Sequence, residues 1–124
     1  DRIQIVKGWL DAEGKQHEAI FDVVWSSPAK RKPVAGKLPP VGDTVDVANA
    51  SYRNSIGASE LVGSFRDPGF DPRQRAFYYA RSIEIPTPRW TAYDALRFGI
   101  KMPPEVPMKH QERAWSSPIW YTPN

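Results

Sequence analysis

The chain has 124 residues, enough for one domain, and its 17 basic and 14 acidic side chains give a net charge of +3. It contains no cysteine, which excludes disulfides, thiolate metal sites and a cysteine nucleophile. The 13 prolines are about twice the usual share of roughly 5%, so we expect short elements separated by rigid turns. No apolar run approaches the roughly 18 residues that a membrane-spanning helix needs, so we expect no membrane partner.

The first 25 residues predict a β-hairpin. Residues 3–10 alternate between apolar positions on the two sides of a strand, and residues 19–25 are rich in β-branched and aromatic side chains. Residues 11–14 between them have the composition of a turn, in which Gly14 can adopt a positive φ.

The middle of the chain has weaker patterns. Residues 28–43 interleave prolines with lysines and predict an exposed loop with extended pieces. Residues 44–50 alternate and predict a strand, and a second weak strand is expected near residues 60–62. Residues 66–72 contain Asp-Pro and Pro-Gly pairs, which favour chain reversal.

Residues 76–85 are the strongest strand candidate. Alternation places Tyr78 and Tyr79 on opposite faces, so one of these aromatic faces must be covered by another part of the protein. Pro86 and Pro88 follow the strand and are expected to end it, because proline cannot donate to a strand ladder.

One short helix is predicted at residues 91–99. Thr91 can cap its start and Gly99 can close it, but two turns are marginal in isolation and must pack on a neighbour. Residues 100–107 predict another proline loop. Residues 113–121 predict a last strand that contains a proline and therefore lies at a sheet edge or carries a bulge.

Together these elements predict a mainly all-β fold with proline-rich loops and one short helix. Its form would be a small antiparallel β-sandwich or a packed sheet of short strands, with residues 1–124 as a single domain. The chain begins with Asp1 and enters a strand pattern at once, so we expect it to be the C-terminal fragment of a larger protein.

Few residues suit catalysis. His17 and His110 have no neighbouring residues at metal-ligand spacing, and no G-x-S-x-G elbow or glycine-rich phosphate loop is present. We therefore expect no catalytic residue, no metal ligand and no cofactor in this segment.

A contact site is predicted where the strongest strand leads into the helix. Two prolines stiffen this segment, which then presents Arg89, Trp90, Tyr93 and Asp94 together. The arginine offers a fork for phosphate or carboxylate, and the aromatic rings offer stacking area. The alternative interpretation is an interdomain contact or a surface anchor.

Four stretches of the chain carry a family resemblance, at residues 1–10, 37–47, 75–95 and 112–123. They resemble the C-terminal end of a bacterial family called domain of unknown function 3604. The resemblance implies a longer parent, often exported to the periplasm or secreted. That parent is similar to metal-dependent phosphoesterases of the polymerase-and-histidinol-phosphatase superfamily. Its divalent metal would be bound by core His, Asp and Glu motifs that do not occur in this chain.

The leading hypothesis is a non-catalytic C-terminal β-module that packs on the N-terminal catalytic region and walls its active site. Isolated from that partner, the module would self-associate through its uncovered apolar surface. The alternative is a free-standing binding module for an anionic ligand or nucleic acid, although nucleic acid is not the expected partner. The residues behind this alternative are Arg53, Arg66, Arg73, Arg75, Arg81 and Arg89, with Tyr78, Tyr79 and Trp90.

Overall fold

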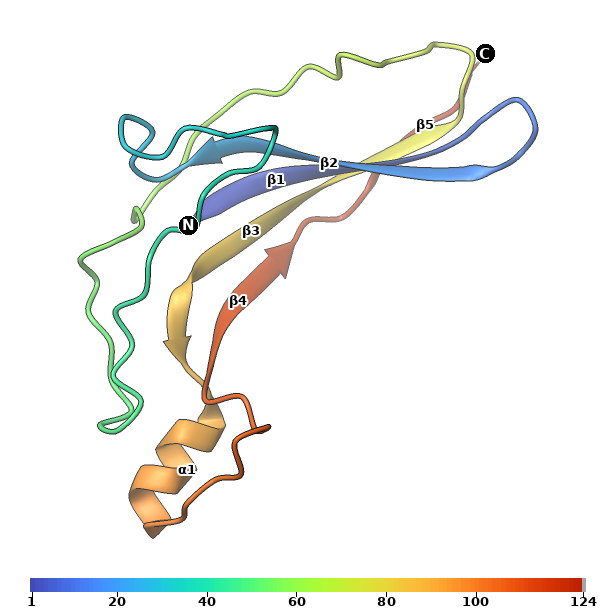
Figure 1. Ribbon diagram of the computed structural model, residues 1–124. Coiled ribbons are helices and arrows are strands. Elements are labelled where there is room, and N and C mark those ends of the chain that lie inside the picture. The colour runs from blue at the N-terminus through green and yellow to red at the C-terminus, as the bar shows by residue number, and fades with distance from the viewer. Residues whose placement is uncertain (124) are drawn as a thin grey trace.

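The computed structural model describes residues 1–123, which form one antiparallel sheet and one helix (Figure 1). The elements in chain order are β1 (Arg2–Leu10), β2 (Gln16–Trp25), β3 (Ala76–Pro88), α1 (Trp90–Phe98), β4 (Lys109–Trp115) and β5 (Ile119–Tyr121). The sheet order is β2-β1-β3-β4, and β5 also pairs with β3. The mainly all-β prediction is confirmed, in the form of one packed sheet. No helix within residues 1–123 is long and apolar enough to cross a membrane.

The predicted hairpin is confirmed as β1 and β2. Its turn is closed by the Asp11 carboxylate, which accepts hydrogen bonds from the backbone N–H groups of Glu13 and Lys15. Gly14 has a φ of 78°, the left-handed conformation that its sequence position predicts. The hairpin is therefore specified by local chemistry.

Strand β3 is the centre of the sheet and runs further than predicted. The expectation that prolines 86 and 88 end the strand is wrong, because β3 continues to Pro88. Pairing with β1 stops where Ile83 faces Arg2, and the pairing with β4 shifts register between Ile83 and Pro86. Beyond that point β3 has a neighbour on one side only, which is where a strand tolerates proline.

The predicted last strand is divided in two. Strands β4 and β5 are separated by residues 116–118, and both pair with β3. At the break, the backbone N–H of Ser116 donates to the Ala80 carbonyl, and its side-chain oxygen accepts from the Ala80 N–H, each at 3.0 Å. A serine thus completes the hydrogen bonds of β3 just before Pro118 interrupts the ladder.

Two predicted strands do not form. Residues 44–50 make only an isolated bridge between Asp46 and Ser51, and residues 60–62 are not in a strand. The Asp46 carboxylate accepts hydrogen bonds from both the backbone and the side chain of Asn49. A short polar side chain that binds its own turn in this way competes with a strand ladder.

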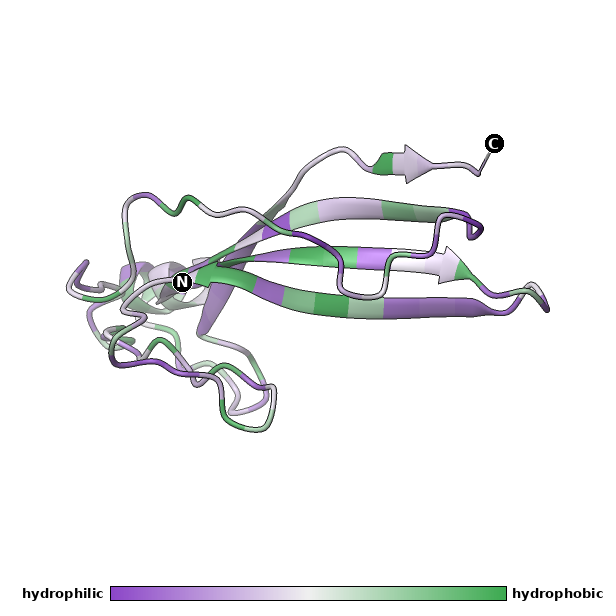
Figure 2. Cartoon of the chain, turned by 90° about the horizontal axis from the view of Figure 1, so that it is seen from above, coloured by the Kyte–Doolittle hydropathy of each residue, from purple (hydrophilic) through white to green (hydrophobic). Residues whose placement is uncertain are grey.

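The sheet has one covered face and one open face. The covered face carries Lys7, Phe21 and Tyr78, and the long loop of residues 26–75 passes over it (Figures 1 and 2). Within that loop, the ring of Phe65 lies 4.9 Å from the ring of Phe21. The open face carries the alternate residues, including Val6 opposite Tyr79. The prediction that one of the two aromatic faces is covered by another part of the protein is thus confirmed, and the covering part is the loop.

Candidate functional site

The predicted contact segment lies at the junction of β3 and α1, and the structure fixes its backbone firmly. Arg89 is the residue that precedes the helix, in an extended conformation and without a side-chain cap. The expected capping role of Thr91 is not observed, because its hydroxyl donates to the Pro107 carbonyl at 2.6 Å. The backbone N–H of Arg89 donates to the Met108 carbonyl at 2.9 Å. The start of α1 is therefore held against the segment that leads into β4.

The four predicted site residues lie near one another at this junction but do not bind one another. Trp90 is 61% exposed and Tyr93 is 49% exposed, while Arg89 and Asp94 are half-buried. None of these four side chains forms a hydrogen bond or ion pair with another residue in the described part of the chain. Their polar and aromatic groups are thus available to a partner.

The helix carries an exposed apolar surface that we call the helix surface. It consists of Trp90, Tyr93, Leu96, Phe98 and Ile100, each at least 49% exposed. Only Thr91 and Ala92 of α1 are buried, and the helix projects from the end of β3 (Figure 1). Gly99 ends the helix as predicted, with a φ of 62°. A two-turn helix in which so little is buried lacks the tertiary packing that normally stabilises one.

The histidines form pairs with single carboxylates. His17 lies 2.6 Å from Asp11, and His110 lies 3.0 Å from Glu112. The hydrogen bond with His17 is the main reason that the pKa of Asp11 is below its ordinary value. Within residues 1–123, no three His, Asp or Glu side chains lie close enough to hold a metal ion.

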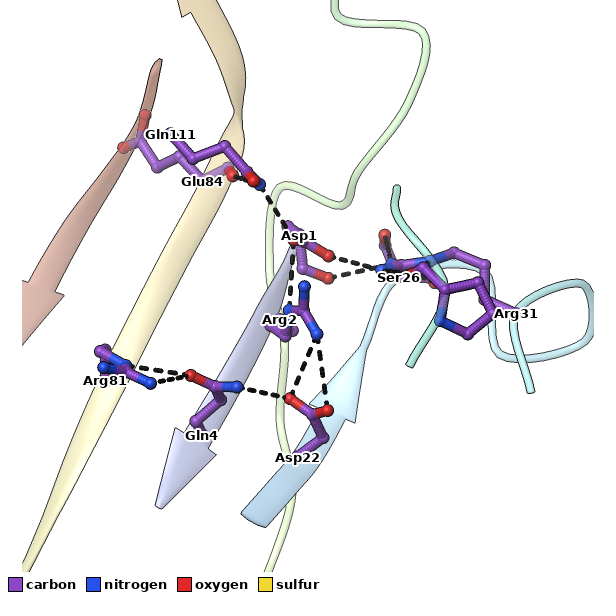
Figure 3. A network of polar contacts seen from close by, with 10 residues as sticks. Asp1, Arg2, Gln4, Asp22, Ser26, Arg31, Arg81, Glu84 and Gln111 are labelled. Carbon is purple, nitrogen blue, oxygen red and sulfur yellow. Dashed lines mark hydrogen bonds and ion pairs between the residues drawn. The ribbon is translucent and has the colours of Figure 1, made fainter. Parts of the chain in front are cut away.

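A buried polar network ties the first residue of the chain to the long loop (Figure 3). The Asp1 carboxylate accepts hydrogen bonds from Arg31 at 2.7 Å and from Gln111 of β4 at 3.0 Å. Arg31 also donates to the side chain of Ser26 and to the Pro39 carbonyl. Burial is the main cause that lowers the pKa of Arg31. Its guanidinium still remains charged, since arginine does not deprotonate in proteins. This network holds residues 26–39 against the sheet.

A second buried cluster holds the later part of the loop. Lys7 donates to the Asp67 carboxylate at 2.5 Å and to the Gly69 carbonyl at 2.9 Å, and the Tyr78 hydroxyl donates to Asp67 at 2.7 Å. Burial alone would raise the pKa of Asp67, but hydrogen bonds from Lys7 and Tyr78 outweigh it and lower that pKa. Burial and the neighbouring Asp67 carboxylate raise the pKa of Tyr78.

The arginine-and-aromatic set behind the anion-binding alternative is not one patch. Tyr78 lies on the covered face, whereas Tyr79 lies on the open face. Arg73 forms an ion pair with Asp71, and the Arg81 guanidinium donates to the Gln4 side chain (Figure 3). The structure therefore distributes these residues over several surfaces.

The open face carries a cluster of aromatic rings that sequence reasoning did not identify. We call it the aromatic cluster, and it consists of Phe77, Tyr79, Trp115 and Trp120. The rings of Phe77 and Tyr79 are parallel within 8° at a centroid distance of 6.4 Å, and Trp120 lies 5.2 Å from Phe77. Alternation in β3 predicts that Phe77 and Tyr79 share a face. The two tryptophans lie beside them only because of the register in which β4 and β5 pair with β3.

These features define the class of the protein: a single-sheet antiparallel β domain with one loop-covered face, one open aromatic face and a projecting helix. The chain belongs to the family of proteins of unknown function DUF3604, whose family model matches residues 1–123. The resemblance noted in the sequence is confirmed at the level of this family. No curated protein and no solved structure matches the chain.

Proposed function

We propose that the chain is a non-catalytic module that packs through α1 on another part of a larger, exported protein. That larger protein would be a metal-dependent phosphoesterase, and residues 89–94 would wall one side of its active site. The metal and its ligands would belong to the other part of that protein. The observation that carries the proposal is the helix surface.

The five side chains of the helix surface expose apolar area that a partner could bury. Burying a large apolar side chain completely stabilises a protein by about 1.5–3 kcal/mol. Side chains that are already half covered gain less, roughly 1 kcal/mol each. Packing the helix surface on a partner would thus contribute several kcal/mol, a magnitude comparable with the net stability of a folded domain.

The start of the helix is held in place by hydrogen bonds. The bonds from Thr91 to Pro107 and from Arg89 to Met108 join the start of the projecting segment to its end, next to the first residue of β4. A surface that is ordered before it binds loses less conformational entropy on binding. Arg89 precedes the helix and Asp94 lies in its middle, so one charge of each sign is offered beside the apolar contact. This arrangement supports a segment that contacts a polar substrate on one side and another part of the protein on the other.

The test compares the full-length protein with its Leu96→Asp variant by hydrogen–deuterium exchange. We expect slow exchange of residues 90–100 in the parent and fast exchange in the variant, because a carboxylate at position 96 cannot be buried without a partner. Val62→Asp is the matched control, since Val62 is 78% exposed and lies outside the helix surface. Fast exchange of residues 90–100 in the unmodified full-length protein would overturn the proposal.

The role of the wall is tested by kinetics on phosphoester substrates. Arg89→Ala and Trp90→Ala in the full-length protein should raise KM or lower kcat, because both residues belong to the segment that would face the substrate. Arg97→Ala is the control on the same helix. If hydrolysis is unchanged by the first two substitutions, the segment is structural only.

A further inference from the structure

The register of the sheet assembles a row of four residues across the open face, at the end of β3 opposite to α1. Glu18 of β2 pairs with Gly8 of β1, Gly8 pairs with Phe77 of β3, and Phe77 pairs with Trp120 of β5. Paired residues on an antiparallel sheet point to the same face. The row therefore presents a carboxylate at Glu18, a glycine without a side chain, and two aromatic rings.

Gly8 makes room for the ring of Phe77 in this row. A Cβ atom at position 8 would lie 2.4 Å from Cζ of Phe77, so the phenyl ring occupies the space of a missing side chain. Beside this ring lies a hollow of about 650 Å³, whose lining includes Gly8, Glu18, Phe77 and Trp120. Ligand cavities in proteins are typically roughly 300–1,000 Å³. The hollow is thus of a size that holds a small ligand.

A second row supplies further polar groups to the same hollow. Gln16 pairs with Leu10, and the backbone N–H of Leu10 donates to the Arg75 carbonyl. The side chains of Gln16, Glu18 and Arg75 are exposed and bind no other residue in the described part of the chain. The hollow therefore offers hydrogen-bond donors and acceptors, without internal partners, beside two aromatic rings.

We infer that this hollow binds a neutral, hydroxyl-rich ligand, namely a sugar unit of a glycan. The apolar face of the sugar ring would stack on Trp120 and Phe77. Its hydroxyl groups would donate to Glu18 and accept from Arg75, and Gln16 can do either. This site is independent of the helix surface and adds a binding role to the proposed function.

The charges in the hollow favour a neutral ligand over charged ones. A cation would be attracted by Glu18 and the ring faces but repelled by Arg75. An anion such as a phosphate would be attracted by Arg75 but repelled by Glu18. A neutral polyol uses both residues as hydrogen-bonding partners and is repelled by neither. A purely apolar protein surface would leave the three polar side chains without partners, which is costly when they are buried.

The surface continues beyond the hollow in a way that fits more than one sugar unit. A second hollow, of about 380 Å³, shares Phe77 and Trp120 with the first and is also lined by Tyr79 and Trp115. Trp120 pairs with Phe77 and Trp115 with Arg81, so the two tryptophans are four residues apart along β3. That separation corresponds to about 13 Å. The aromatic cluster therefore extends the site along the strand, as an oligosaccharide would require.

The test is isothermal titration calorimetry of the full-length protein with neutral hexasaccharides of glucose, mannose, xylose and N-acetylglucosamine. We expect saturable binding of at least one of them. Trp120→Ala should weaken this binding by about tenfold, because it removes a stacking surface. Glu18→Gln replaces one carboxylate oxygen by an amide group and should also weaken binding. An unchanged circular dichroism spectrum would show that the fold of this variant is intact. Trp90→Ala removes another exposed tryptophan, from the helix surface, and should leave binding unchanged.

Three results would overturn the inference. The first is that no hexasaccharide binds at millimolar concentration. The second is that the sugars do not bind, whereas tetramethylammonium or sulfate does and loses this binding in Trp120→Ala. The third is a dimer, seen by sedimentation, that Trp120→Ala dissociates, because the face would then be an interface between copies. Leu96→Asp should not change sugar binding, so failure of this inference and failure of the proposed function are distinguishable.

Discussion

The buried contact between Lys7 and Asp67 gives the sharpest prediction about stability. Lys7→Met keeps the apolar length of the side chain but removes the charge that holds the loop on the covered face. The two side chains are only 5% and 7% exposed, and Lys7 also donates to Gly69 and lies 4.9 Å from the centre of the Trp9 ring. Removing one partner of a buried ion pair leaves the other charge uncompensated. The expected loss is about 3 kcal/mol in the free energy of unfolding.

The assay is urea unfolding followed by tryptophan fluorescence, in parallel with hydrogen exchange of residues 61–70. The exchange should accelerate in Lys7→Met, because Asp67 keeps only the Tyr78 hydroxyl and the Gly69 N–H as donors. Arg73→Met removes a partner of the ion pair with Asp71, in which the Arg73 side chain is 87% exposed, and should produce no measurable change.

A double substitution separates the charge from the packing. In Lys7→Met with Asp67→Asn no charge is left buried, so part of the lost stability should return. A loss below about 1 kcal/mol in Lys7→Met, with unchanged exchange of residues 61–70, would refute the reasoning. The loop would then be held by contacts other than this ion pair.

Three further predictions follow from the same geometry. The pKa of Asp67 is lowered in the folded protein. Its contribution to stability is therefore present above the unfolded pKa of about 3.9 and is lost as the pH falls below that value. In Asp67→Asn, the free energy of unfolding should fall less steeply with decreasing pH. The raised pKa of Tyr78 means that stability is full below about pH 10 and falls above it, and Tyr78→Phe should remove this alkaline dependence. Gly8→Val should destabilise by about 1–3 kcal/mol in urea unfolding, because its side chain meets the Phe77 ring.

The sequence by itself determines the elements whose stability is local. The hairpin turn is closed by Asp11 and Gly14, within five residues of one another. Strand β3 is predicted by its aromatic and β-branched content, and the end of α1 is predicted by Gly99. The site residues Arg89, Trp90, Tyr93 and Asp94 are close together in the chain, so their proximity could be predicted without the fold.

Sequence patterns failed where the deciding partner is distant in the chain. Alternation at residues 44–50 is compatible with a strand, but no neighbouring strand is supplied and Asp46 binds Asn49 instead. The prolines of β3 are tolerated because its pairing with β1 stops at Ile83, opposite the first residue of β1, which is a property of strand pairing. A local sequence pattern does not show which strand will pair with a segment, or how far that pairing will extend.

The open face shows most clearly which features follow from local sequence and which follow from strand pairing. Alternation groups Phe77 with Tyr79, but only the tertiary structure places Gly8, Glu18 and Trp120 in one row with Phe77. These residues are brought together by the registers of three strand pairs, and a shift of one residue in any register would send a side chain to the other face. Register depends on the pairing of whole strands. The hollow and its chemistry are therefore decided by the fold, while the strands that build it are decided by the sequence.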